Sequence, residues 1–212
     1  MSKSLYSVIL TDEIVYEIDR LALKQNTNRS NLINQILAEY VSYVTPEMKI
    51  NSIFRTIEEF INESTHLVPE VLPQRSTMSL KGNLDYRYRP TVKYDVELFK
   101  SFEGSSIGRL SVVFRTQSEL LLSRMNEFFK LWCYLEGSIF NKDITYTLSD
   151  GRFNRSITLN PNKSYTPKEI ADAISAYIKL FDDCMKNYLS GKYSENDIII
   201  KLKSHTVKEV LI

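Results

Sequence analysis

Five cations between residues 84 and 115 follow a two-residue alternation that could create a binding surface for a charged ligand. They are Arg87, Arg89, Lys93, Arg109 and Arg115. Alternate side chains of a strand point to one face, so in a two-stranded hairpin all five would project together. Guanidinium and ammonium groups arranged this way suit a small anionic effector rich in phosphate, or the backbone of a nucleic acid.

The same strand face also carries carboxylates, which supports a second interpretation. Asp95 and Glu97 alternate with the cations, and the hairpin register would bring Glu97 close to Arg109. Pairs of opposite charge across neighbouring strands are common in solvent-exposed sheets. The sequence therefore leaves two alternatives open, a ligand site and an ordinary solvated face.

Other chemistry has little support in the sequence. There is no glycine-rich phosphate loop and no nucleophile paired with a histidine, and the carboxylate pairs are sequence neighbours, which do not share a helix face. The two histidines, His66 and His205, have no ligand spacing around them. We expect no catalytic residues, no metal site and no cofactor, and hence a protein that is not an enzyme.

Composition favours a packed protein of the cytoplasm. The 212 residues are 43% hydrophobic with a formal net charge of +1. This balance says little about partners, because nucleic-acid binders need only a local basic patch. Cys133 and Cys184 lie in apolar helical runs and are expected to be reduced, buried thiols. The sequence has no signal peptide and no apolar stretch long enough for a bilayer, so no membrane contact is expected.

The N-terminal residues predict a short strand followed by two helices. Leu5 to Leu10 alternate, with Tyr6, Val8 and Leu10 on one face and Leu5, Ser7 and Ile9 on the other. Thr11 then caps a helix with an acidic first turn, residues 25–28 form a turn, and Ser30 caps a second helix with a broad apolar stripe. One strand and two helices cannot bury these stripes alone, so we expect an intertwined homodimer with its two strands paired antiparallel.

This order of elements resembles the ribbon-helix-helix superfamily (Arc, MetJ and CopG-like proteins) over residues 3–44. The segment LTDEIVYEIDRLALKQ corresponds to the strand end and first helix, and TNRSNLINQILAEYV to the turn and second helix. The resemblance implies that the two-stranded ribbon lies in the major groove of double-stranded DNA, while the start of the second helix binds phosphates.

Carried over to this chain, the resemblance assigns Leu5, Ser7 and Ile9 to the DNA bases. It assigns Lys3, Asn28, Arg29, Ser30 and Asn31 to the phosphates. The base-facing positions depart from the family pattern, because hydrocarbon side chains read base edges weakly compared with the usual Arg, Lys, Asn, Gln or Thr.

The rest of the chain predicts a second folded part. Thr45 and Pro46 begin a linker helix, and residues 64–82, which lack periodicity, suggest a connector. Residues 83–212 then predict two strands, a helix to Glu136, a hairpin turned at Asp150-Gly151, a long helix and a last strand over residues 197–202. Without its first strand this order is βαββαβ, or ferredoxin-like. The expected fold is α+β, with a ribbon-helix-helix domain (1–45), a linker helix and connector (46–82) and an α+β regulatory or oligomerisation domain (83–212).

The function predicted from these patterns is a sequence-specific, DNA-binding transcriptional regulator from a prokaryote or phage. It would be a homodimer, or a tetramer, whose C-terminal domain controls assembly or senses an effector. Two alternatives stay open: an interaction or adaptor protein that uses the ribbon-helix-helix only to dimerise, supported by the apolar ribbon face, and an atypical antitoxin. The operator, the effector and the direction of regulation are not encoded in any recognisable motif.

Overall fold

The computed structural model describes residues 5–62, 66–72, 76–84, 89–103, 105–140, 144–160 and 162–206. The fold class is α+β, as predicted from the sequence. In chain order the elements are α1 (Asp12–Lys24), α2 (Arg29–Tyr40), α3 (Pro46–Asn62), β1 (Val68–Leu72), β2 (Thr77–Asn83), β3 (Thr91–Glu103), β4 (Ser106–Arg115), α4 (Glu119–Phe140), β5 (Tyr146–Ser149), β6 (Arg152–Thr158), α5 (Pro167–Leu189) and α6 (Glu195–Thr206).

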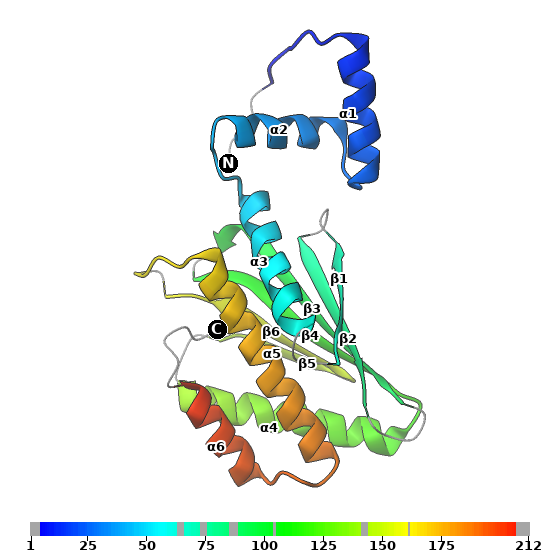
Figure 1. Cartoon of the computed structure of the whole chain (residues 1–212). Helices are drawn as coiled ribbons and strands as arrows, with labels where there is room; N and C mark the ends of the chain where they lie inside the picture. The colour runs from blue at the N-terminus through cyan, green and yellow to red at the C-terminus, as the bar shows by residue number, and fades with distance from the viewer. Residues whose placement is uncertain are drawn as a thin grey trace.

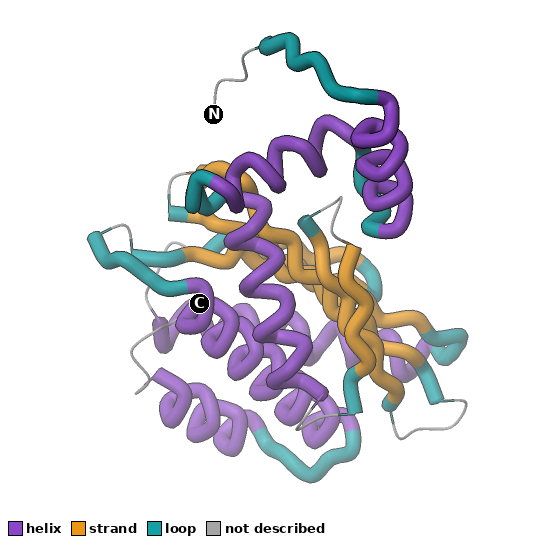
Figure 2. Tube along the Cα trace, turned by 45° about the horizontal axis from the view of Figure 1, so that its top comes forward, coloured by secondary structure: helices purple, strands orange, loops and turns teal. Residues whose placement is uncertain are grey.

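One antiparallel sheet organises most of the chain, with strand order β1-β2-β3-β4-β6-β5. Helices α3, α4 and α5 pack on one face of it, and α6 packs on α4 and α5 (Figures 1 and 2). The alternation predicted for β3 is confirmed, because Val92, Tyr94, Val96 and Leu98 are buried toward the helices. The opposite face, which we call the open face, carries the polar side chains and is not covered by any part of the chain that the structure describes.

The core between the sheet and the helices is built around aromatic rings. Phe181 of α5 lies within ring-contact distance of six other aromatic side chains, and its closest partner is Trp132 of α4, at 4.9 Å between ring centroids. Aromatic pairs of this kind add stability beyond the area that they bury. This cluster fixes α4 and α5 on the sheet and so determines which side chains are left for the open face.

Several predicted boundaries are confirmed by their local geometry. Gly151 turns the β5–β6 hairpin with a φ of 64°. This value lies in the left-handed region that favours glycine. Thr166 and Glu169 form a reciprocal capping box at the start of α5. Gly137, by contrast, does not end α4: the helix runs on to Phe140, and Ile139 and Phe140 pack against the core.

The ferredoxin-like arrangement expected for residues 83–212 is not what the sheet shows. Residues 197–202, predicted as its last strand, belong to helix α6. Ser194 and Asp197 exchange hydrogen bonds at the start of this helix, which stabilises its first turn. Ile198 and Leu202 are both buried four residues apart, a helical spacing. The β-branched run of isoleucines favoured a strand locally, but the cap and the packing favour a helix.

The connector expected at residues 64–82 is also wrong, because residues 68–72 and 77–83 form strands β1 and β2 of the sheet. Pro69 has no N–H to donate, which would break a hydrogen bond between two strands in the middle of a sheet. It is tolerated here because β1 is an edge strand. The linker helix itself is confirmed as α3, whose apolar side packs on α5 and on the sheet. Helix α3 and strands β1 and β2 therefore belong to the same packed body as the strands that follow.

Candidate functional site

Residues 5–10, expected to form a ribbon strand, have no regular secondary structure in this single chain. They form no strand, because a strand requires a hydrogen-bonded neighbour and no described segment lies beside them to supply one. Most of their apolar side chains are in solvent: Leu5 is 98% exposed, Tyr6 84% and Ile9 100%. The structure thus leaves the Leu5, Ser7 and Ile9 face exposed, and on the other face Tyr6 and Val8 are exposed while Leu10 is partly buried.

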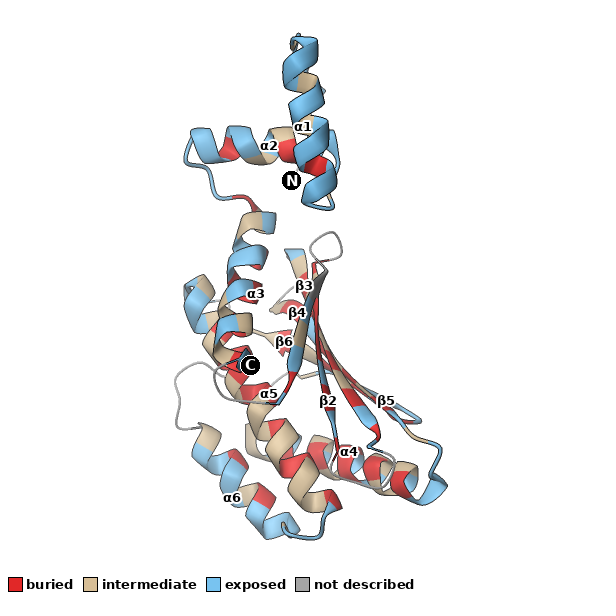
Figure 3. Cartoon of the chain, turned by 45° about the vertical axis from the view of Figure 1, so that its right-hand side comes forward, coloured by how far each residue is buried: buried red, intermediate tan, exposed pale blue. Residues whose placement is uncertain are grey.

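Helices α1 and α2 pack on each other and project away from the sheet, to which α3 joins them (Figure 1). Their buried residues are small in number: Ala22 in α1, and Leu32 and Ala38 in α2. Large apolar side chains remain exposed on both helices, and most of their surface is therefore coloured as exposed in Figure 3. The exposed apolar residues include Ile14, Leu21, Leu23, Ile36, Leu37, Tyr40 and Val41.

The start of α2, where the resemblance predicts phosphate contacts, differs in detail from the expectation. The N-cap is Asn28 rather than Ser30, and the Asn28 side chain accepts a hydrogen bond of 2.9 Å from the backbone N–H of Asn31. Ser30 and Asn31 are exposed within the first turn. Lys3 lies outside the described residues. Asparagine suits this position because its short side chain reaches the amide three residues on.

Arg29 makes a two-pronged ion pair with Asp19 of α1. Its Nε donates to Oδ1 at 2.7 Å and its Nη2 donates to Oδ2 at 2.5 Å. The hydrogen bond from Arg29 lowers the pKa of the Asp19 carboxyl, and the same bond raises the pKa of Arg29. Both side chains are about half exposed, so the pair orients Arg29 more than it stabilises the fold.

The predicted cation cluster on the first hairpin is only partly available. Arg109 pairs with Glu97 at 2.6 Å, the pairing that the solvated-face interpretation expected, and Lys93 pairs with Asp95 at 2.9 Å. Arg115 is exposed at the end of β4. Arg89 is exposed just before β3, with a positive φ of 42°, and Arg87 lies outside the described residues.

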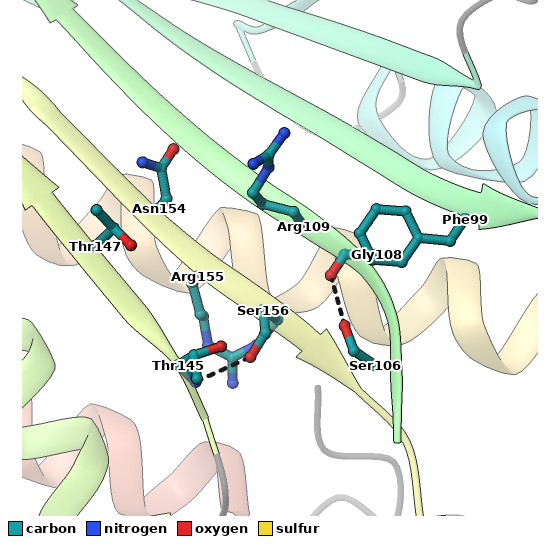
Figure 4. Close-up of a pocket in the computed structure, with 9 residues that line it drawn as sticks. All are labelled: Phe99, Ser106, Gly108, Arg109, Thr145, Thr147, Asn154, Arg155 and Ser156. Atoms are coloured by element: carbon teal, nitrogen blue, oxygen red, sulfur yellow. Dashed lines mark hydrogen bonds between the residues drawn. The ribbon is translucent and has the colours of Figure 1, made fainter. Parts of the chain in front are cut away.

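A shallow hollow of about 250 Å³ lies on the open face, at the end where β4 begins (Figure 4). Its walls are mostly hydroxyl and amide side chains together with Phe99 and Arg109, and the full lining is Phe99, Ser106, Gly108, Arg109, Thr145, Thr147, Asn154, Arg155 and Ser156. Ser156 already accepts a hydrogen bond from the backbone of Thr145, and Arg109 is paired with Glu97. A second hollow of about 220 Å³ lies beside the β5–β6 turn, between α4 and β5.

A buried charge network behind the open face was not predicted from the sequence. Arg155 of β6 and Glu136 of α4 are 1% and 0% exposed, and the closest atoms of their ion pair are 2.8 Å apart. Tyr177 donates to Glu136 at 3.0 Å and accepts from the Trp132 indole at 2.9 Å. Burial alone lowers the pKa of Arg155, but Tyr177 and Glu136 together raise it above its ordinary value. All of these groups face the core, so the network is structural.

Neither cysteine forms a disulfide with a described residue; Cys184 is buried as predicted, whereas Cys133 is only partly buried. Burial raises the pKa of the Cys133 thiol to about 12 and that of the Cys184 thiol to about 12. The reactive thiolate is therefore scarce at neutral pH.

We expect both thiols of the native protein to react with Ellman's reagent far more slowly than the same thiols in denaturant. A fast native reaction at pH 8 would contradict this burial.

The remaining observations restrict the chemistry of the described residues. None of the described helices combines the length and the apolar character needed to cross a membrane. Within the described ranges, no group of three or more His, Cys, Asp or Glu side chains is placed to hold a metal ion. Comparisons with family models, with curated proteins and with solved structures found no match to this chain.

Proposed function

We propose that this protein is a homodimeric, DNA-binding transcriptional regulator of the ribbon-helix-helix type that acts in the cytoplasm. One observation carries the proposal: an unpaired apolar segment leads directly into two short helices whose large apolar side chains remain exposed. Pairing residues 5–10 of two chains would satisfy the backbone and bury this surface in one step. The ribbon made in this way would place Leu5, Ser7 and Ile9 on its outer face, toward the DNA.

The start of α2 supports phosphate binding in this proposal. Asp19 uses two of the five N–H donors of Arg29, so the rest of the guanidinium can still bind a phosphate oxygen. Ser30 and Asn31 lie beside it in the first turn, where backbone N–H groups favour an anion. The sheet domain would then control assembly of the dimers into tetramers, or sense an anionic effector.

A second candidate, the interaction protein that only dimerises through this unit, is favoured by charge. Residues 5–44 contain five carboxylates and three cations, and this balance repels DNA at long range. The apolar outer face of the ribbon would suit a protein partner as well as thymine methyl groups. The atypical antitoxin is a weaker alternative, since the ribbon-helix-helix unit here is followed by a large folded domain rather than by a short tail.

DNA binding across a salt series separates the two candidates. We expect the purified protein to bind mixed DNA fragments with an affinity that falls steeply with salt, because each phosphate contact releases counterions. Arg29→Ala should lower the slope of log affinity against log salt by about one unit on every DNA sequence. Arg20→Ala, which breaks a pair within α1, is the matched control and should leave the slope unchanged.

Two results would count against this proposal. An absence of DNA binding at low salt, where phosphate attraction is strongest, would leave the interaction protein as the better candidate. An equal loss of slope in Arg29→Ala and Arg20→Ala would show that binding depends on general charge rather than on the start of α2.

A further inference from the structure

Two neighbouring rows of the open face carry four cations and, among the described residues, no carboxylate. The strand registers place Lys81 of β2 opposite Lys93 of β3, Lys93 opposite Val113 of β4, and Val113 opposite Arg152 of β6. Directly opposite residues share a face of the sheet, so these side chains lie side by side. Arg115 lies two residues beyond Val113 on the same face of β4, in the next row, opposite Thr91 of β3. We call Lys81, Lys93, Arg115 and Arg152 the basic row.

The basic row contains an arrangement that is unfavourable for the fold alone. Lys81 and Lys93 face each other directly across β2 and β3, and like charges at such positions destabilise a sheet. Each is compensated from the next row of the face: Lys81 by Glu70 at 2.7 Å and Lys93 by Asp95 at 2.9 Å. Arg115 is exposed, and Arg152 is exposed beside it. No ion pair within the described part of the chain involves either guanidinium.

The shape of this region indicates the kind of anion that it fits. The row crosses the four neighbouring strands β2, β3, β4 and β6. At the usual spacing between strands, this crossing has a width of about 14 Å. Neither of the two hollows described above includes Lys93, Arg115 or Arg152. A small nucleotide needs a concave site that encloses it, whereas a flat line of cations suits a polymer whose successive phosphates each find a partner.

We propose that the basic row is a second nucleic-acid contact, which binds the sugar-phosphate backbone of a nucleic-acid strand without reading its sequence. Arg115 and Arg152 supply the guanidinium groups that bind phosphate oxygens, and Lys93 and Lys81 add charge on the neighbouring strands β3 and β2. This contact goes beyond the proposed function, because it lies on the sheet domain and requires neither the ribbon nor the start of α2. Two of its four members, Lys81 and Arg152, come from strands whose pairing only the structure reveals.

The test compares the full-length protein with a double variant, Arg115→Gln with Arg152→Gln, by the anisotropy of labelled DNA and RNA oligonucleotides of mixed sequence. These changes break no ion pair between described residues, and matched thermal unfolding checks the fold. The control is Lys163→Gln with Lys168→Gln, which removes the same charge from exposed positions away from the basic row. We expect the double variant to bind about tenfold more weakly. Its slope of log affinity against log salt should fall by the amount of about two phosphate contacts, and the control should leave both quantities unchanged.

Three results would overturn this inference. Equal slopes in the double variant and its control would show that the basic row makes no contact. If the double variant no longer bound inorganic tripolyphosphate but still bound the oligonucleotides as the wild type does, the site would be one for a small anion. If Arg29→Ala abolished binding and the double variant bound as well as the wild type, the proposed function would stand without this contact. If the double variant lost binding and Arg29→Ala did not, the contact on the sheet would stand without the proposed function.

Discussion

Glu136→Ala should be among the most destabilised single variants of this protein. It removes the carboxylate that pairs with Arg155 in a site where both side chains are essentially unexposed, and it also removes the acceptor of the Tyr177 hydroxyl. Breaking a buried ion pair in this way costs about 3 to 5 kcal/mol, because the remaining charge has lost its compensation. We expect that loss in the free energy of unfolding measured by urea denaturation.

The control for this prediction is Glu127→Ala, which removes an exposed carboxylate from the same helix. It should change stability by about 0.5 kcal/mol or less. Replacing both partners, with Glu136→Leu and Arg155→Met, should recover much of the lost stability, since an apolar pair of similar volume carries no desolvation penalty. A Glu136→Ala protein as stable as Glu127→Ala would show that the network contributes little.

Ile36→Asp should dissociate the proposed dimer. Ile36 lies on the exposed apolar side of α2, at 43% exposure in the single chain, and the second protomer would cover it. An unpaired carboxylate in such an interface costs several kcal/mol, so the dimer should dissociate at concentrations at least about a hundredfold higher than the wild type does. Sedimentation equilibrium across a dilution series measures this shift.

Asn26→Asp is the matched control, because it adds the same negative charge in the α1–α2 turn instead of on the apolar side of α2. Asn26 is exposed. Its backbone has a positive φ of 52°. Aspartate tolerates this conformation almost as well as asparagine does, so the variant should leave dimerisation unchanged. If Ile36→Asp also remained dimeric, the helices would not form the interface, and dimerisation would have to be sought elsewhere on the chain.

The helices of the N-terminal unit were predictable because their signals are local. The acidic first turn of α1 and the apolar spacing of both helices act within a few residues. The strand predicted for residues 5–10 is untested by a single chain, because the hydrogen bonds of a strand come from a second segment. Strands β1 and β2 were missed for a related reason. The alternation of Met78 and Leu80 is short, and Pro69 argued against a strand because proline is tolerated only at a sheet edge.

The candidate sites that were predictable are also the ones that depend on local sequence, and those that were missed depend on contacts between distant segments. The pairing of Glu97 with Arg109 was predictable because one hairpin fixes their register. Arg152 could be placed beside the hairpin cations only once β4 was seen to pair with β6, a contact across α4 and β5 in sequence. Glu136 and Arg155 come from a helix and a strand whose packing depends on the whole aromatic core.

The short stretch between α2 and α3 determines the geometry of any assembly that this chain makes. Val41 to Thr45 includes Ser42 with a positive φ of 55°, and Thr45 caps α3 by accepting a hydrogen bond from the Met48 N–H at 3.2 Å. Because α3 is packed on α5, it moves with the sheet domain as one rigid lever. At the usual rise per residue of a helix, this lever is about 25 Å long. If two chains form the proposed dimer, a small torsional change near Ser42 would therefore change the distance between their two sheet domains, while the packing inside each domain stayed unchanged.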